Sequence, residues 1–477
     1  MQTLRSHPAR SGWRRKLLVG AGVATAVGLA YANPVAAQEL DAATVQANLN
    51  NIFVLVCAVL VIFMQAGFAL VEAGLTRAKS VGNIMLKNMI DFCAGAIAFY
   101  AVGYAFAFGP VESGLKEYIG LDGWFLGDGA AGVGDIDKST FFVFQVAFAA
   151  TAATIVSGAM AERTKFKSYF VYSFIISAII YPVVVHWGWG GGWLATMDTP
   201  FHDYAGSAIV HMTGGLAAFW GAKVLGPRIG KYGPDGKPRA ILGHNIPFAI
   251  LGCFILLVGW FGFNPGSGLV GDASAAAVAL TTALAGAAGA LGALATVWVK
   301  TGKPDVGMVG NGLLAGLVAI TAGCAVISGP FSILVGFLGG ILVVFGVDFI
   351  EKVLKVDDPV GAVAVHGVCG IWGTLAVGLF AGEGGLLLGD GADQLITQII
   401  GLVAIFVWVS VTSILMFLGI KAVMGLRVSE EEELAGLDIE EHGSPGYGEG
   451  FGTFVPSFAS NGDSEEATAA PEPAATS

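Results

Sequence analysis

Eleven apolar stretches, each long enough to cross a lipid bilayer, constrain the fold of this chain more than any other feature. They lie at roughly 51–74, 84–109, 140–161, 168–187, 204–224, 241–263, 272–299, 306–326, 330–349, 361–382 and 394–424. Soluble domains are about 25% charged, whereas only 12% of these residues are charged and 55% are hydrophobic. Small residues let membrane helices pack closely, and the chain has 71 glycines. We therefore predict an all-α membrane protein with eleven transmembrane helices.

Basic residues gather in every second connection between these stretches. Of the 24 Lys and Arg residues, five lie before residue 17, and only Lys116 and Lys138 lie in the opposite set of connections. Positively charged loops stay in the cytoplasm. We therefore predict a multi-pass protein of the cell (inner) membrane, with its mature N-terminus outside and its C-terminus in the cytoplasm.

The two ends of the chain differ from the apolar middle. Residues 1–37 have a basic start, an apolar run and small residues before Gln38, which is typical of a cleaved signal peptide. An uncleaved first membrane helix is the alternative. Residues 428–477 contain twelve acidic and no basic residues, so they account for the net charge of −11. We expect a signal peptide over 1–37, a membrane domain over 45–425 and an acidic cytoplasmic tail over 426–477, its last part disordered.

A motif occurs twice, as D-x2-G-x3-V-H-x3-G, at 203–215 and at 358–370. The predicted orientation makes the two copies enter the membrane from opposite faces, which implies two inverted five-helix repeats plus one extra helix. In each copy the His follows the Asp by eight residues, or about 12 Å of helix. The bilayer core is ~30 Å thick, so we predict that His211 and His366 meet near its centre.

Ionisable groups within a membrane are functional candidates. Two neutral imidazoles can share a proton and line a polar path, because each offers one donor and one acceptor. The alternative is that each His only bonds a neighbouring helix, but duplication favours a function for His211 and His366. We expect Asp203 and Asp358 to cap their helices. No Cys/His spacing suits a metal site, and we expect no cofactor.

The chain resembles the ammonium transporter family (Amt/MEP/Rh) over residues 45–445. The resemblance is carried by the twin motif and by segments 63–74, 144–148, 188–192, 259–267 and 366–373. It implies a transporter of ammonium, with methylammonium as an analogue. An enzyme is not expected, because no nucleophile, base and oxyanion donor are grouped by spacing, and we expect no nucleic-acid partner. The resemblance also implies a homotrimer in the bilayer, with one pore through each subunit.

The resemblance assigns roles to particular residues. An outer recruitment site corresponds to Phe148, Trp189 and Ser267. Stacked rings corresponding to Phe148 and Phe263 form a gate, and His211 and His366 line the pore below it. Supporting positions near the outer site correspond to Asp203, Trp260, Phe144 and Gln145. The presence of Trp189 and Ser267 favours the Amt branch over the Rhesus branch.

The chemistry of ammonium suits these residue types. Ammonium and potassium are alike in size and charge, but only ammonium can lose a proton. We predict that the protein recruits ammonium at the aromatic site, deprotonates it at the Phe gate and conducts ammonia past the two His residues, with or without a separately moved proton.

Two other functions remain open. A transporter-like ammonium sensor would carry an appended signalling domain, and residues 425–477 are too few for one. A passive channel for another small neutral solute would not need Trp189 and Ser267. Residues 436–447 resemble the family's cytoplasmic tail motif, which implies a P-II signalling protein as a partner at the cytoplasmic face.

Charged residues inside the first two apolar stretches are predicted to form local ion pairs. Glu72 lies within reach of the turn that contains Arg77, and Asp91 follows Lys87 by four residues. Residues at this spacing lie on the same face of a helix. We therefore expect Glu72 to pair with Arg77, and Asp91 to pair with Lys87.

Overall fold

The structure is a computed structural model that describes residues 41–448. The predicted signal peptide and the last part of the acidic tail lie outside these residues. The chain divides at Asn50 into two units. The described part of the first unit is the start of helix α2, and the second unit holds every other described element.

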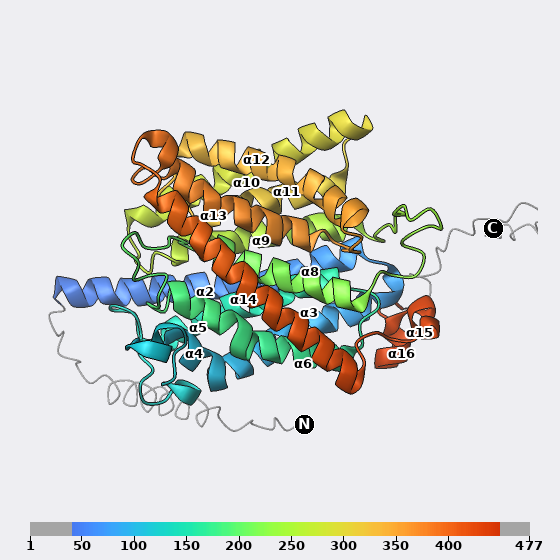
Figure 1. The fold of residues 1–477 in the computed structure, drawn as a ribbon, viewed down its shortest axis with the longest axis horizontal. Coiled ribbons are helices and arrows are strands. Elements are labelled where there is room, and N and C mark those ends of the chain that lie inside the picture. The colour runs from blue at the N-terminus through green and yellow to red at the C-terminus, as the bar shows by residue number, and fades with distance from the viewer. Residues whose placement is uncertain (1–40, 449–477) are drawn as a thin grey trace, which may run out of the picture. The chain divides into compact units, whose positions relative to one another are not determined.

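The described chain is helical throughout its membrane region (Figure 1). In chain order the elements are α2 (Ala42–Leu75), α3 (Val81–Ala98), η2 (Phe99–Gly103), α4 (Tyr104–Phe108), α5 (Lys138–Ala159), α6 (Phe166–Ile175), η5 (Ile176–Ile180), α7 (Tyr181–Gly188), η6 (Ser207–Met212), α8 (Thr213–Leu225), α9 (Ile246–Gly266), α10 (Ala273–Thr301), α11 (Val306–Thr321), α12 (Gly329–Asp348), η7 (Phe349–Val353), η8 (Val363–Val368), α13 (Cys369–Phe380), α14 (Asp393–Met424), α15 (Glu430–Ala435) and α16 (Leu437–His442). Short turns η1 (Ala78–Ser80), η3 (Gly114–Glu117), η4 (Trp124–Leu126) and η9 (Leu386–Leu388) lie between them.

Every one of the eleven predicted stretches forms a helix in the described chain. Ten of these helices are long and apolar enough to cross a membrane, once segments such as α3, η2 and α4 are joined end to end. The remaining helix, α11, has 16 residues and ends at Thr321, five residues before the predicted end of its stretch. The all-α membrane fold is therefore confirmed.

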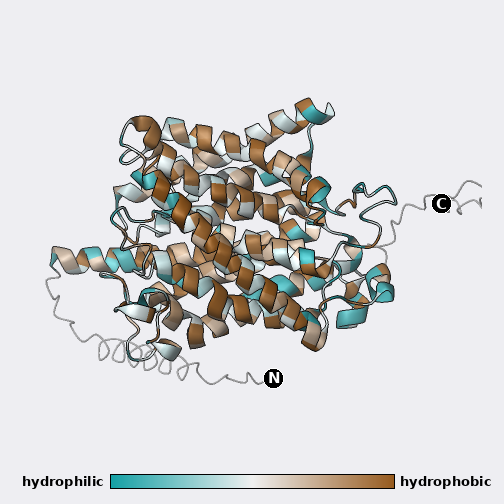
Figure 2. Cartoon of the chain, viewed as in Figure 1, coloured by the Kyte–Doolittle hydropathy of each residue, from teal (hydrophilic) through white to brown (hydrophobic). Residues whose placement is uncertain are grey.

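Apolar residues cover the middles of the long helices, whereas hydrophilic residues gather at their ends and in the connections (Figure 2). Such a distribution suits a bilayer, because apolar side chains face the hydrocarbon core. The helices also satisfy their backbone hydrogen bonds internally, as a bilayer requires. Side-chain caps satisfy several helix ends that face the connections. Asp137 accepts a hydrogen bond from the backbone N–H of Ser139 (2.8 Å), and Asp305 accepts one from Met308 (2.7 Å).

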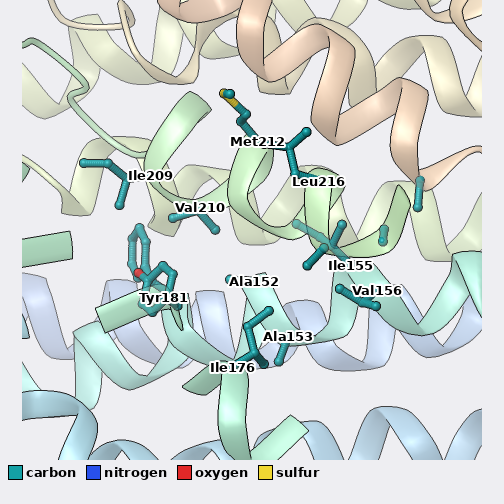
Figure 3. Packing of buried hydrophobic residues seen from close by; sticks show 14 of the residues in the cluster. Ala152, Ala153, Ile155, Val156, Ile176, Tyr181, Ile209, Val210, Met212 and Leu216 are labelled. Atoms are coloured by element: carbon teal, nitrogen blue, oxygen red, sulfur yellow. The ribbon is translucent and has the colours of Figure 1, made fainter. Parts of the chain in front are cut away.

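One buried cluster joins the two sequence halves, because it includes Val210 of η6 and Val365 of η8. Figure 3 shows side chains of α5, among them Ala152 and Ile155, opposite Val210 of η6 and Leu216 of α8. All four belong to one buried cluster. The helices that carry the two copies of the motif are thus embedded in the core of the bundle.

Arg77 does not pair with Glu72, so that prediction was wrong. Its Nε donates to Glu162 instead, and Arg228 donates to Glu162 (3.0 Å) and to Asp357 (2.9 Å from Nε to Oδ2). Burial would raise the pKa of the Glu162 carboxyl, but the charges of Arg228 and Arg77 outweigh it and lower that pKa. The cluster joins connections that lie far apart in the sequence.

The predicted Lys87–Asp91 ion pair was also wrong. Asp91 accepts a hydrogen bond from the Tyr169 hydroxyl of α6. The Lys87 Nζ lies 5.2 Å from the centroid of the Tyr169 ring and has no hydrogen-bond partner within the described residues. Both charges are buried.

The described part of the acidic tail packs against one end of the bundle, where Figure 1 shows α15 and α16. The Asp438 carboxylate accepts hydrogen bonds from the backbone N–H groups of Gly82 (3.0 Å) and Asn83 (2.8 Å). These groups belong to the first turn of α3, where the helix has no backbone partner for them. Lys79 donates to the carbonyl oxygen of Glu433 (2.7 Å). The tail therefore caps a membrane helix.

Candidate functional site

A cavity of about 150 Å³, the Trp189 cavity, lies where α5, α7 and α9 approach one another. Five side chains predicted at or near the recruitment site line it, namely Phe144, Gln145, Phe148, Trp189 and Ser267. The sequence did not single out its other lining residues, which are Val133, Phe141, Tyr204 and Leu269. Tyr204 directly follows Asp203 of the motif, but an aromatic residue beside a helix cap carries no signal of its own.

Two polar groups of the Trp189 cavity can accept hydrogen bonds. Ser267 donates its hydroxyl proton to the Phe263 carbonyl oxygen (2.8 Å), which leaves its lone pairs free to accept. The Gln145 Oε1 is buried and has no partner among the described residues. Trp189 donates from Nε1 to the Asp203 carbonyl oxygen (2.7 Å), which fixes its ring. Within residues 41–448, no charged side chain lines the cavity.

Asp203 caps the helix that carries His211, as predicted. Its two carboxylate oxygens accept four backbone hydrogen bonds of 2.8–2.9 Å, from Gly206, Ser207, Ala208 and Ile209. The turn requires φ = +112° at Gly206, a conformation that favours glycine.

Asp358 forms the corresponding cap in the second copy. It accepts hydrogen bonds from the backbone N–H groups of Gly361 (3.1 Å) and Val363 (2.8 Å), and Gly361 has φ = +79°. The Asp and the first Gly of the motif therefore have the same physical role in both copies. The inverted repeat is visible in backbone conformation as well as in sequence.

The two predicted histidines meet. The Nδ1 atoms of His211 and His366 are 3.2 Å apart, and the rings stack with 5.2 Å between centroids and 23° between planes. One ring must donate at this contact while the other accepts, so neutral rings adopt different tautomers. Each His lies in a π-helical turn, η6 or η8, and such turns are frequent at functional sites.

Close helix packing holds the histidines together. A Cβ atom at Gly215 would lie 2.3 Å from the backbone nitrogen of Gly367, and one at Gly370 would lie 2.4 Å from the carbonyl oxygen of Ser207. The last Gly of each motif copy therefore lets the two His-bearing helices cross in backbone contact.

A line of aromatic rings connects the Trp189 cavity to the histidines. Phe148 and Phe263 stack at 4.1 Å between centroids, and Phe263 stacks on His211 at 5.3 Å. Both Phe rings are at most 1% exposed. On the far side, Phe68 lies 6.0 Å from the His366 ring. We call these residues, Phe148, Phe263, His211, His366 and Phe68, the ring line.

Trp260 lies beside the first histidine. It does not line the Trp189 cavity but stacks on His211 at 5.1 Å and 22°. Its Nε1 donates to the Thr321 hydroxyl (2.9 Å). Trp260 therefore supports the first histidine from the side.

A second cavity, of about 20 Å³, lies beyond His366 and is called the Glu72 cavity here. Among its lining residues are Phe68, Glu72, Thr154 and Asn311. The sequence reading assigned no site to Phe68 or Glu72. The sequence does contain a pattern that could have indicated such a site, because Gly67-Phe68-x3-Glu72 has the spacing of Gly262-Phe263-x3-Ser267.

Known proteins share both the sequence and the fold. A model of the Ammonium Transporter Family matches residues 52–447. Ammonium transporter Amt2 of Archaeoglobus fulgidus is 46% identical over 416 residues, which cover 83% of this chain and 87% of that protein. Ammonium transporter 1 member 3 of Solanum lycopersicum is 39% identical over 445 residues, covering 85% and 94%.

Solved structures of Amt and Mep proteins have a similar fold. A structure named Sensor Amt Protein has a TM-score of 0.79 at 40% identity and covers 83% of this chain and 99% of its own. Candida albicans Mep2 has a TM-score of 0.74 at 28% identity, covering 82% and 90%.

Proposed function

Because the chain belongs to the ammonium transporter family, we propose that it recruits ammonium in the Trp189 cavity, deprotonates it at Phe148 and Phe263, and conducts ammonia past His211 and His366. A proton moves separately or not at all. The ring line carries this proposal, because it joins two cavities through two rings that have polar edges. The family is one of transporters, and the proposal involves no cofactor.

Recruitment follows from the groups that face the Trp189 cavity. A tryptophan face attracts a cation by roughly 0.5–2 kcal/mol. Ser267 accepts an N–H from ammonium, because its own proton is already donated to Phe263. Gln145 offers a further acceptor. Asp203 fixes this arrangement from the cap without lining the cavity.

Selection follows from the closed rings. An ion that stays charged between Phe148 and Phe263 loses its water, and the idealised cost of burying a charge is of order 20 kcal/mol. Ammonium avoids most of this cost by losing a proton, which potassium and sodium cannot do. The His211–His366 pair then offers ammonia hydrogen bonds in an otherwise apolar passage.

We propose that the Trp189 cavity faces the outside of the cell (inner) membrane. Arg77 and Arg228, which both pair with Glu162, support a cytoplasmic location for the opposite end, as does the described tail. Family membership supports a homotrimer with one pore in each subunit. It also supports a P-II signalling protein as a partner at the cytoplasmic face.

The proposed function is tested by flux. Full-length protein in proteoliposomes should respond to an ammonium pulse with internal alkalinisation or with a transient current. An equal potassium pulse should produce neither. Liposomes that contain folded protein but match empty liposomes would contradict transport.

We expect Trp189→Leu combined with Ser267→Ala to raise the ammonium concentration for half-maximal uptake about tenfold to hundredfold, because a cation–π contact and a hydrogen bond are both lost. Uptake of methylammonium in a concentration series measures this. Trp298→Leu is the control, since Trp298 lies outside both cavities and is 53% exposed. Unchanged half-saturation in the double variant would place the recruitment site elsewhere.

Orientation can be measured with reporter fusions. A reporter after Lys237 should be cytoplasmic and one after Asp122 should be external, because basic residues gather in the connections on the Lys237 side. Alkaline phosphatase and fluorescent-protein fusions give opposite signals at each position. Reversed signals would contradict the proposed orientation.

A sensor is the second candidate function, because the structure named Sensor Amt Protein is similar over 83% of this chain. A sensor binds ammonium in the same Trp189 cavity without conducting it. Binding of ammonium to purified protein with no flux in proteoliposomes would favour this candidate over transport.

A further inference from the structure

The Glu72 cavity is the counterpart of the Trp189 cavity in the other half of the repeat. In the first half, Phe68 lies against His366, and Glu72 follows Phe68 by four residues. In the second half, Phe263 stacks on His211, and Ser267 follows Phe263 by four residues. Both fourth residues line a cavity at their own end of the ring line. Glu72 therefore occupies the position that Ser267 occupies in the recruitment site.

The Glu72 side chain is buried, with hydrogen bonds from Ser157 and Asn88. Its Oε2 accepts a hydrogen bond from the Ser157 hydroxyl of α5 (2.7 Å), and its side chain is 3% exposed. The nearby charged groups are Lys87 and Asp91 of α3. Lys87 has no hydrogen-bond partner within the described chain, and Asp91 is bonded to Tyr169.

Two other polar residues of the cavity donate their hydrogen bonds to groups other than Glu72. Thr154 donates its hydroxyl proton to Gln65 (2.8 Å), and Asn311 donates from Nδ2 to the Val360 carbonyl oxygen (3.0 Å). Among the described residues, Glu72 is thus the only one with a carboxylate that lines this cavity. A volume of about 20 Å³ holds a single molecule of the size of water, and ammonia and ammonium have that size.

We propose that Glu72 forms a second ammonium site, at the end of the pore opposite to the recruitment site. The proposal rests on the proposed transport function and deepens it. Ammonia that leaves His366 takes the proton of the neutral Glu72 carboxyl, so that an O–H bond breaks and an N–H bond forms. The products are a carboxylate and an ammonium ion paired in the cavity. The ammonium ion leaves to water, and a hydronium ion returns a proton to the carboxylate.

The proposal is tested by infrared difference spectroscopy on full-length protein in lipid, with ammonium chloride as the probe and potassium chloride as the comparison. Ammonium should change a carboxyl band in the wild type and in Trp189→Leu, whose recruitment site is impaired. Glu72→Gln should lose that band. A band that persists in Glu72→Gln, or that potassium produces equally, would overturn the site.

Flux measurements supply the matched control. Glu72→Gln should lower ammonium flux about tenfold, because a hydrogen bond to a charged group is lost, and Ser157→Ala should lower it less. Asp91→Asn changes an equally buried carboxylate that does not line the cavity, so it should keep the wild-type flux and the infrared band. Equal losses in Glu72→Gln and Asp91→Asn would mean that charge balance, and not a site, explains the effect. Absence of flux in the wild type would instead refute the proposed transport function.

Discussion

Replacing His211 with alanine should lower ammonium and methylammonium flux about tenfold to hundredfold. The change removes one partner of the 3.2 Å contact and leaves the Nδ1 of buried His366 unpaired. An unsatisfied buried polar group costs about 1–3 kcal/mol. Ammonia that passes this point also loses a hydrogen-bond partner, so its free energy there rises by a similar amount. Stopped-flow uptake in proteoliposomes measures the effect. His244→Ala is the control, because His244 bonds Thr76 and Tyr447 and is not part of the ring line.

His211→Asp should behave differently from His211→Ala. An aspartate can still hold a proton or accept a hydrogen bond from His366, so more ammonium flux should remain. Its fixed negative charge also lowers the cost of a cation that cannot lose a proton. We therefore expect a potassium current in His211→Asp that the wild type lacks. Normal ammonium flux in the alanine variant, with potassium excluded from all three proteins, would make the histidines structural.

Gly215→Ala should lower both thermal stability and flux. The added methyl group would lie 2.3 Å from the Gly367 nitrogen and 2.5 Å from its Cα. These are backbone atoms that cannot rotate away, so the His-bearing helices must separate, at a cost of about 1–3 kcal/mol for overpacking. Separation lengthens the His211–His366 contact, and we expect a lower unfolding midpoint together with at least about a tenfold loss of flux.

Gly419→Ala is the matched control for Gly215→Ala. Gly419 lies in α14, and a Cβ atom there would meet nothing within 4 Å. An alanine within a helix is favoured over glycine by up to about 1 kcal/mol, so this variant should be at least as stable as the wild type. A stable, fully active Gly215→Ala protein would show that the helices tolerate separation.

Much of the fold could be predicted because membrane helices depend on local sequence. Apolar length alone located every stretch that became a helix, from α2 to α14. The meeting of His211 and His366 was predictable because the motif repeats at equal depth from opposite faces. The repeat thus made it possible to predict a contact between His211 and His366, which lie far apart in the sequence.

Contacts between distant segments could not be predicted in the same way. Arg77 was expected to pair with Glu72, five residues earlier, but its partner is Glu162, 85 residues later. Spacing along a helix identifies neighbours on the same face, yet it says nothing of charges that another connection brings closer. The stacking of Trp260 on His211 also depends on a distant segment, since Trp260 donates to the Thr321 hydroxyl of α11.

The stacked Phe148 and Phe263 rings have a consequence for the energy supply of the cell. Each elementary charge that crosses a membrane releases about 2.3 kcal/mol per 100 mV, so a water-filled pore for cations would drain the membrane potential. In the proposed mechanism, these two rings, whose centroids are 4.1 Å apart, interrupt any column of water between the two cavities. In the proposed mechanism each resting subunit is therefore an electrical insulator.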